Sequence, residues 1–285
     1  MPNGKVAIIT GGASGIGHAV AQLLSQKGWT IHILDIARDP GEAVAAKLSN
    51  TTFREVDITS YPSLSAAFDA AFKTAGRVDF VFANAGVIEK PGFYAPVTSL
   101  PPPLYDELCL DTNIRGILRT AYLAQHYFRA NPRGGRDCVL ILTCSVAGLY
   151  AQDFVPLYSA AKAGVLNFAR SIAAPMYESD GVRTYAICPG SVRTGLLPKE
   201  AWDAYPQEYL TAMQKVTDTV EALVEGKRLE DSNGKVAEEG KHNGLMVEIF
   251  VDDVYFREPL EPCNDGMKYV QGFLTESRRS ASKGD

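Results

Sequence analysis

Tyr158 and Lys162 stand four positions apart in the sequence, a spacing that could do acid–base chemistry. On a helix, residues at i and i+4 project from the same face. A free phenol has a pKa of about 10 and is a poor base at neutral pH, whereas a neighbouring ammonium favours the phenolate. Ser145 could then hydrogen-bond a substrate oxygen while Tyr158 exchanges its proton. A Tyr-x-x-x-Lys pair alone is more typical of a solvated helical face, so its weight depends on the other motifs.

A glycine-rich loop near the start of the chain is the second chemical signal. Thr10–Gly17 follows an apolar run and opens a helical pattern, with glycines at 11, 15 and 17. Without side chains the backbone can turn sharply and approach a pyrophosphate, which then sits on the helix N-terminus. A plain strand–helix turn is the alternative, but the position of the loop favours a nucleotide site. The predicted phosphate-binding residues are Gly11, Ser14, Gly15, Ile16 and Gly17.

Asp35, at the end of the next apolar run, decides which nucleotide is expected. A carboxylate at this place accepts hydrogen bonds from the adenosine ribose hydroxyls and repels a 2′-phosphate. Its neighbours Ala13, Ser14 and Ile36 carry no positive charge. The sequence therefore predicts NAD as the cofactor. NADP is the alternative, with Arg38 as the nearby cation that could hold the extra phosphate.

Short apolar runs that alternate with helical patterns must position these residues. Most runs are continuously apolar, as in parallel strands covered on both faces. Ile16, Val20 and Leu23 lie on one face of a helix that ends at Gly28. Strand–helix–strand repetition predicts an α/β fold with a Rossmann-type, doubly wound parallel sheet of about seven strands. The expected strands are Val6–Ile9, Ile31–Leu34, Thr52–Val56, Phe80–Ala83, Val139–Leu142, Thr184–Ile187 and Met246–Val251.

The 285 residues, 46% of them apolar, show no composition break that would mark a linker. We therefore expect one domain over residues 1–275, followed by a disordered tail over 276–285. Two segments interrupt the rhythm of strands and helices, at Val87–Tyr105 and at 191–242. Because long insertions in a compact domain are usually functional or mobile, residues 191–242 are expected to form a substrate lid. The roles of 87–105 and of the charged stretch 214–242 stay open.

The composition argues against several classes of partner. The net charge is −5 and there is no long basic cluster, so nucleic acid and anionic membrane surfaces lack a counter-charge. No apolar stretch approaches the roughly 20 residues of a membrane span, and Lys5 leads directly into a strand instead of a signal peptide. Five scattered cysteines and four unclustered histidines predict neither a disulfide framework nor a metal site. A cytoplasmic protein is expected.

Taken together and in this order, the motifs resemble the short-chain dehydrogenase/reductase family across roughly residues 4–255. The resemblance implies a nicotinamide-dependent oxidoreductase, and a homodimer or homotetramer formed through the helices around 104–130 and 155–175. A non-catalytic nucleotide-binding regulator is less favoured, because such a protein has no need of a proton-transfer set. The matching motifs are Thr10-Gly11-x-x-x-Gly15-x-Gly17, Asn84-Ala85-Gly86, Asn113, Ser145, Tyr158-x-x-x-Lys162 and Pro189-Gly190.

The resemblance also implies a role for each matching residue. Tyr158 would be the catalytic acid/base, Lys162 its pKa-lowering and ribose-binding partner, and Ser145 the group that orients the substrate. Asn113 would hold a water molecule in the proton relay. The remaining cofactor contacts would be Asp57 and Ile58 at the adenine, Asn84, Ala85 and Gly86 at the adenosine ribose, and Pro189, Gly190, Val192 and Thr194 at the nicotinamide carboxamide.

The two long segments give the first indication of the substrate. Both are rich in apolar and aromatic residues, which favours a lipophilic alcohol or ketone, although the same residues could simply pack the core. Residues 186–190 and 243–246 are similar to the NAD-dependent 15-hydroxyprostaglandin dehydrogenase-like branch, which many fungal secondary-metabolite dehydrogenases also resemble. This likeness implies oxidation of a secondary alcohol with NAD, the alternative being an NADPH-dependent ketoreductase. The run Val251-Asp252-Asp253-Val254 departs from the Asp-Gly-Gly often found there.

Overall fold

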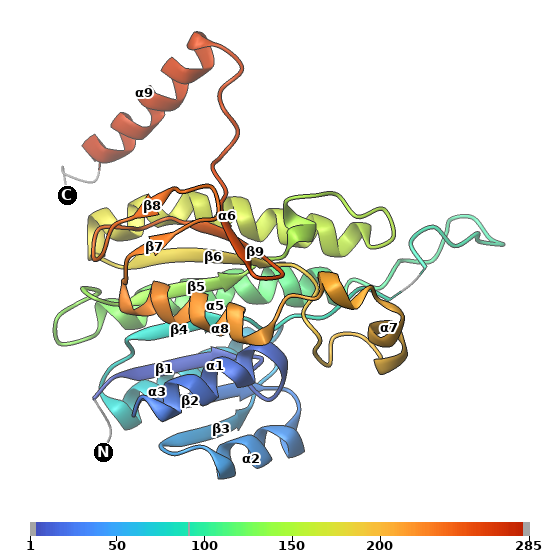
Figure 1. The fold of residues 1–285 in the computed structure, drawn as a ribbon, viewed down its shortest axis with the longest axis horizontal. Coiled ribbons are helices and arrows are strands. Elements are labelled where there is room, and N and C mark those ends of the chain that lie inside the picture. The colour runs from blue at the N-terminus through green and yellow to red at the C-terminus, as the bar shows by residue number, and fades with distance from the viewer. Residues whose placement is uncertain (1–3, 91, 282–285) are drawn as a thin grey trace.

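The computed structural model describes residues 4–90 and 92–281 (Figure 1). Its centre is an eight-stranded sheet in the order β10-β9-β6-β5-β4-β1-β2-β3, in which every neighbouring pair is parallel except β9 with β10. All seven predicted strands are confirmed, and the eighth was not predicted. The strands are β1 (Val6–Thr10), β2 (Thr30–Asp35), β3 (Thr51–Glu55), β4 (Phe80–Ala83), β5 (Val139–Thr143), β6 (Arg183–Pro189), β9 (Met246–Phe250) and β10 (Asp253–Phe256).

Helices cover both faces of the sheet, which explains why its strands read as continuous apolar runs. Along β1, Ile8 packs into one apolar cluster, while Ala7 and Ile9 pack into the cluster on the opposite face. The first cluster includes α3 (Tyr61–Ala75), α5 (Ile117–Arg129) and α6 (Pro156–Asp180). The second includes α1 (Gly15–Gln26), α2 (Arg38–Lys47) and α8 (Met213–Glu225).

The strand order reverses beside β1, which pairs with β2 on one side and with β4 on the other. At such a switch point the chain leaves neighbouring strands in opposite directions, and a crevice opens at the carboxyl ends of the strands. The glycine loop leaves β1 at this edge, and Asn84 follows β4 there. Ser145 follows β5 at the same edge, and Gly190 follows β6. The topology therefore gathers the predicted site residues along one edge of the sheet.

The expectation of one lid over 191–242 is wrong for the second half of that segment. Val216, Val220 and Leu223 of α8 are fully buried in the core on one face of the sheet. Their spacing of four and three residues gives α8 an apolar face that packs against the sheet and α1. Beyond it lies a small hairpin of β7 (Leu229–Glu230) and β8 (Val236–Ala237). The part with α7 (Lys199–Ala204) and a 3₁₀ turn at Gln207–Tyr209 buries Trp202 but adds no residue to the two apolar clusters.

The predicted disordered tail also differs from the structure. Helix α9 runs over Asp265–Ala281, so residues 276–281 are helical, while 282–285 lie outside the described residues. Met267, Val270 and Leu274 recur at helical spacing and favour a helix over coil. In Figure 1, α9 (red) stands off from the body of the protein at the end of a long connection.

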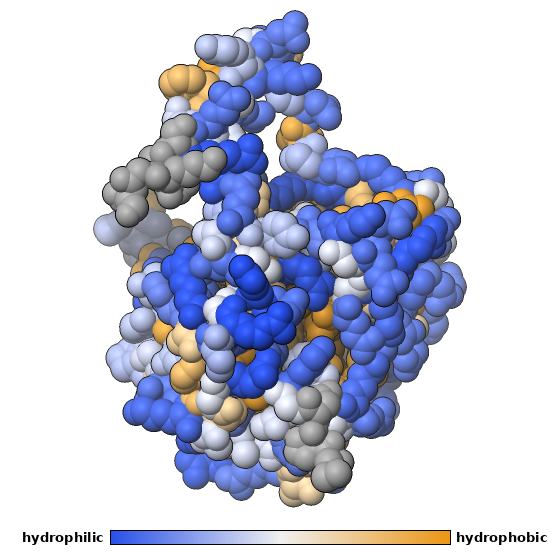
Figure 2. Space-filling model, turned by 90° about the vertical axis from the view of Figure 1, so that its left-hand side faces the viewer, coloured by the Kyte–Doolittle hydropathy of each residue, from blue (hydrophilic) through white to orange (hydrophobic). Residues whose placement is uncertain are grey.

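Figure 2 shows one face of the molecule, on which hydrophilic side chains predominate and hydrophobic ones lie scattered between them. In the described part of the chain, no helix combines the length and apolar character needed to cross a membrane.

Candidate active site

The glycine loop forms a cradle at the N-terminus of α1 that side chains would fill. A Cβ atom at Gly17 would overlap the carbonyl oxygen of Gly11, and one at Gly11 would lie 2.7 Å from Cα of Ala85. Gly11 also has a φ of +68°, which a side chain disfavours. Ser14 is the N-cap residue of α1, and its exposed hydroxyl does not cap the helix. Main-chain N–H groups and an exposed hydroxyl at a helix N-terminus suit a pyrophosphate.

Asp35 closes one side of this cradle. Its carboxylate accepts hydrogen bonds from the main-chain N of Ala13 and of Ala37, both at 3.0 Å, and this fixes it at the end of β2. Arg38 pairs with Glu55, with Nε 2.8 Å from Oε2. The carboxylate therefore lies where a ribose is expected, while the one predicted phosphate-binding cation already has an anionic partner.

Asn84 braces the sheet edge. Its side-chain amide donates to the carbonyl oxygens of Thr10 and Gly11 at 3.2 and 3.3 Å, and its Oδ1 accepts from the hydroxyl of Thr143 at 3.1 Å. These bonds tie together the ends of β1, β4 and β5. The structure thus gives the Asn84 side chain a structural task, and places Ala85 against Gly11.

Asp57 and Ile58, the two residues predicted to contact the adenine, lie in different environments. Asp57 accepts two hydrogen bonds from Thr59, at 2.8 Å from both its N and its hydroxyl, and forms the turn after β3. Ile58 is buried in the core, where a Cβ at Gly116 would lie 2.5 Å from its Cδ1. The side chain of Ile58 therefore serves packing, and only Asp57 remains at the surface of this edge.

The loop after β6 returns to the glycine cradle. The main-chain N of Gly190 donates to the Ile249 carbonyl at 2.8 Å, and Val192 is buried. Thr194 lies against Gly15, where a Cβ would come within 3.1 Å of its Cγ2. Trp202 on α7 donates from its indole nitrogen to the Thr194 carbonyl at 2.8 Å. The glycine loop and the loop after β6, which are far apart in the sequence, thus lie against each other at the carboxyl edge of the sheet.

Ser145, Tyr158 and Lys162 come together at the carboxyl end of β5. Lys162 Nζ lies 5.5 Å from the centroid of the Tyr158 ring and donates to the Thr143 carbonyl at 2.9 Å. The Ser145 hydroxyl accepts from the main-chain N of Ala147 at 3.1 Å, and its influence on Tyr158 is to lower the pKa of the phenol. The predicted spacing on α6 therefore produces a compact Ser–Tyr–Lys group.

The acidity of the phenol differs from the expectation. Burial raises the pKa of Tyr158 to about 12, and the hydrogen bond from Ser145 opposes this rise. Burial also lowers the pKa of Lys162, whose ammonium points at the Thr143 carbonyl. Removal of the hydroxyl from water is therefore the largest influence on the pKa of this phenol in the chain without cofactor.

Asn113 lies within a π-helical turn, Asp111–Gly116, that precedes α5. Such turns are rare and frequently mark functional sites. Its amide holds the main chain of Val87 from both sides, donating to the carbonyl at 2.6 Å and accepting from the N at 3.0 Å. A Cβ at Gly86 would lie 2.7 Å from Asn113 Oδ1, so this glycine leaves room for the clasp.

Glu89 was not predicted as a site residue. It is 7% exposed, and its Oε2 accepts a hydrogen bond from the main-chain N of Tyr158 at 2.6 Å. In the sequence, the motif Asn84-Ala85-Gly86 is followed by the apolar pair Val87-Ile88 and then by the carboxylate of Glu89. A charged residue at this place is the one sequence signal that could have pointed to Glu89.

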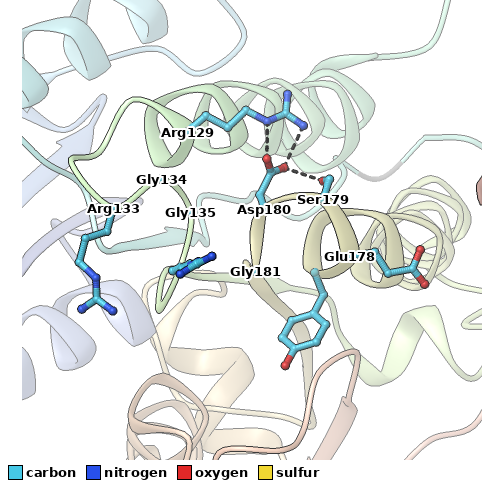
Figure 3. A pocket seen from close by; sticks show the side chains of 10 residues that line it. Arg129, Arg133, Gly134, Gly135, Glu178, Ser179, Asp180 and Gly181 are labelled. Atoms are coloured by element: carbon cyan, nitrogen blue, oxygen red, sulfur yellow. Dashed lines mark hydrogen bonds and ion pairs between the residues drawn. The ribbon is translucent and has the colours of Figure 1, made fainter. Parts of the chain in front are cut away.

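A separate hollow of about 440 Å³ lies far from this group, where α5 and α6 end (Figure 3). Two of the residues that line it, Arg129 and Asp180, are joined directly by a two-point ion pair, at 2.8 Å for both bonds. None of the predicted site residues lines it. The predicted site is therefore at the opposite end of α6, where that helix begins.

The fold and the site define an α/β protein with a glycine cradle at the switch point of its sheet and the residues Ser145, Tyr158 and Lys162 at the same edge. Residues 5–204 match the family model described as short chain dehydrogenase. The chain belongs to the short-chain dehydrogenase/reductase family, and is an oxidoreductase that acts on CH–OH donors with a nicotinamide cofactor and a small-molecule substrate.

Individual relatives agree with this family. The chain is 42% identical over 267 residues to the short-chain dehydrogenase/reductase prx7 of Penicillium rubens, covering 90% of this chain and 94% of that protein. It is 30% identical to human 15-hydroxyprostaglandin dehydrogenase [NAD(+)], covering 76% and 79% of the two chains. The fold is similar to that of the 3-ketoacyl-(acyl-carrier-protein) reductase from Brucella melitensis complexed with NADH, with a TM-score of 0.71, 23% identity, and 87% and 97% coverage.

Proposed function

We propose that this protein is an NAD-dependent oxidoreductase that moves a hydride between a secondary alcohol, or the corresponding ketone, on a lipophilic substrate and the nicotinamide. Tyr158 is its acid/base. The observation that carries the proposal is the juxtaposition of the Ser145–Tyr158–Lys162 group with a glycine cradle at the same sheet edge.

The chain's own residues divide the work as follows. Ser145 holds the substrate oxygen beside the Tyr158 hydroxyl, which takes the proton in oxidation and returns it in reduction. Lys162 keeps a positive charge close to the phenol, and Asn113 fixes the neighbouring main chain at Val87 and the relay water. The bound nicotinamide supplies the chemistry of accepting or giving the hydride.

The cofactor would be held by residues that the structure gathers along this edge. Gly11, Ser14 and the start of α1 fit the pyrophosphate, and Asp35 fits the adenosine ribose. Main-chain groups at Ile58 and Asn84 are proposed to contribute, because both side chains are already engaged. The remaining proposed contacts are Gly15, Ile16, Gly17, Asp57, Ala85, Gly86, Tyr158, Lys162, Pro189, Gly190, Val192 and Thr194.

NAD is proposed over NADP because of the charges beside the cradle. Asp35 would repel a 2′-phosphate, and Arg38 is engaged by Glu55. The name of the human relative gives NAD(+) as its cofactor, which supports the same choice.

A lipophilic substrate is proposed from the segment that follows Glu89. Phe93, Tyr94 and Tyr105 form a cluster of aromatic rings, with centroids 5.2 and 6.1 Å from that of Phe93. Leu100 in the same segment is 88% exposed. In Figure 1 this segment extends to the right from the end of β4, the side on which α7 lies. The human relative is named for a hydroxyprostaglandin, which agrees with a lipophilic alcohol.

A homodimer or homotetramer in the cytoplasm is part of the same proposal. Leu108, Tyr122 and Tyr177 are exposed apolar side chains on or beside α5 and α6, the helices expected to pair. Cys109, Cys138, Cys144 and Cys188 are buried free thiols, which suits a reducing compartment.

The test is a cofactor titration followed by a screen of lipophilic secondary alcohols with NAD. We expect NADH to bind more tightly than NADPH and reduced cofactor to accumulate with at least one alcohol. Tyr158→Phe should lower turnover by about 10²–10⁴-fold while cofactor affinity is largely kept, because the hydroxyl acts on the proton. Tight NADPH binding with negligible NAD affinity, or undiminished turnover of Tyr158→Phe, would contradict the proposal.

A further inference from the structure

We propose that Glu89 is a positioning residue, whose buried carboxylate caps the first turn of α6 at Tyr158 and so sets where the phenol lies. The inference rests on the proposed role of Tyr158 and adds a residue to it. Glu89 acts through the Tyr158 main chain, to which its Oε2 is bonded at 2.6 Å.

The first turn of α6 lacks an ordinary cap. The N-terminal N–H groups of a helix have no partner inside the helix, and a side-chain oxygen at the N-cap position usually accepts one of them. Here the N-cap residue is Val155, whose side chain cannot accept a hydrogen bond, and Pro156 at the first position has no N–H. Tyr158 stands at the third position, and Glu89 supplies the missing acceptor. A negative charge is favourable at this end of a helix.

Glu89 is itself held from the other side. Val87, two residues earlier, is clasped through both main-chain groups by Asn113. Residues 87–89 therefore form a strap that joins Asn113 to the Tyr158 backbone. One residue after the strap, Lys90 pairs with Asp106 at 2.7 Å and closes the base of the proposed substrate segment.

The strap matters because Tyr158 and Lys162 are anchored differently. Lys162 is fixed one turn further along α6, through its bond to the Thr143 carbonyl. Loosening the first turn would therefore move the phenol relative to both the ammonium and the Ser145 hydroxyl. A misplacement of about 1 Å can cost about 100-fold in rate.

The experiment compares Glu89→Ala and Glu89→Gln in the full chain, by steady-state kinetics with NAD and by hydrogen-exchange mass spectrometry of the peptide that contains Tyr158. Glu89→Ala should lower kcat by about 10- to 100-fold, leave the KM for NAD within about twofold, and speed amide exchange in the first turn of α6. Glu89→Gln should keep most of the wild-type kcat and most of the wild-type protection from exchange, because its amide oxygen still accepts a hydrogen bond from the Tyr158 N–H.

Asp231→Ala is the matched control. Asp231 is also a buried carboxylate that accepts from main-chain N–H groups, those of Asn233 and Lys235, but it lies in the β7–β8 hairpin. Its loss should lower the thermal midpoint without changing kcat or exchange at Tyr158.

Two results would overturn the proposal. The first is that Glu89→Ala keeps the wild-type kcat and the wild-type rate of amide exchange. The second is that Glu89→Gln loses as much kcat as Glu89→Ala, which would show that the charge of Glu89, and not its hydrogen bond to the Tyr158 N–H, supports turnover. If the wild-type chain turns over none of the tested alcohols, amide exchange in the first turn of α6 alone tests whether Glu89 holds the Tyr158 main chain. Failure of the proposed function is distinguishable, because it appears as undiminished turnover of Tyr158→Phe.

Discussion

Lys162 shows how the site keeps a charge away from water. The side chain is 2% exposed, and its ammonium donates to the Thr143 carbonyl. Burying an ion without partners is costly, and the protein limits that cost with a main-chain oxygen at the end of β5. The Cys144 thiol donates to the Lys162 carbonyl at 3.1 Å, which fixes the backbone from which this side chain leaves. The Lys162 nitrogen is thus positioned by main-chain groups of the scaffold.

His32 is buried on β2, and its titration should make stability depend on pH. Burial lowers its pKa to about 4, while the unfolded chain keeps an ordinary value of about 6.5. The folded state therefore resists a proton that the unfolded state takes up, so stability is full above pH 6.5 and is lost as the pH falls toward 4. We expect protonation of this group alone to lower the free energy of unfolding by about 2 kcal/mol between about pH 7.5 and about pH 5, as measured by urea unfolding.

The comparison variant for this prediction is His32→Leu, which has nothing to titrate at this position. Its unfolding free energy should change less with pH than that of the wild-type chain. His126→Gln, which removes an exposed imidazole on α5, serves as the control and should keep the wild-type dependence. Equal slopes for wild type and His32→Leu would show that the buried ring does not resist protonation.

At the scale of elements, the turn from β1 into α1 tolerates no side chain at Gly17. A Cβ there would overlap the Gly11 carbonyl oxygen and lie 2.7 Å from Asn84 Nδ2. Gly17→Ala must therefore shift the loop backbone, at a cost of about 1–3 kcal/mol. We expect a lower thermal midpoint and at least a tenfold loss of NADH affinity by fluorescence titration.

Gly195→Ala is the control for Gly17→Ala. Apart from its two chain neighbours, none of the described residues has an atom within 4 Å of a Cβ at Gly195, and the residue follows Thr194 in the same region. It should bind NADH as the wild-type chain does. Retained affinity in Gly17→Ala would show that the loop can open without disturbing the cofactor site.

The elements that could be predicted from the sequence are those whose signal is local. Buried parallel strands are continuous apolar runs, and a glycine cradle is a spacing, so both are visible in the residues themselves. Helix α8 is harder to predict, because the charged residues around Val216, Val220 and Leu223 are typical of a surface insertion although the three apolar residues have helical spacing. Strand β10 begins at Asp253 beside a second aspartate, and such residues are rare in strands.

The part of the site that could not be predicted depends on contacts between distant segments. The bond between Glu89 and the Tyr158 backbone joins residues far apart in the chain. The same is true of the Arg38–Glu55 pair, which joins α2 to the end of β3. Periodicity carries no information on such pairs, because it reports which face of an element is covered and not which group covers it.

At the scale of the whole molecule, α9 lies outside the packed layers (Figure 1). Met267, Val270, Phe273 and Leu274 are exposed along it. Arg278 pairs with Glu178 at 2.7 Å and Arg279 at 2.6 Å, which joins the far part of α9 to the last turns of α6. These arginines lower the pKa of Glu178 to about 2, so the pairs stay charged at neutral pH. The site, by contrast, is at the opposite end of α6.

This arrangement predicts that deletion of residues 262–285 leaves the catalytic body intact. Exposed ion pairs contribute little to stability, so the thermal midpoint should move by only a few degrees, and turnover with NAD should stay within about twofold. Glu178→Gln, which removes the pairing charge and keeps α9, should behave in the same way. A large loss of turnover on deletion, with Glu178→Gln unaffected, would instead show that the apolar face of α9 supports the active body, either within one chain or across two copies. Light scattering of the two variants would separate those cases, because support across two copies requires the deletion to lower the molecular mass of the assembly.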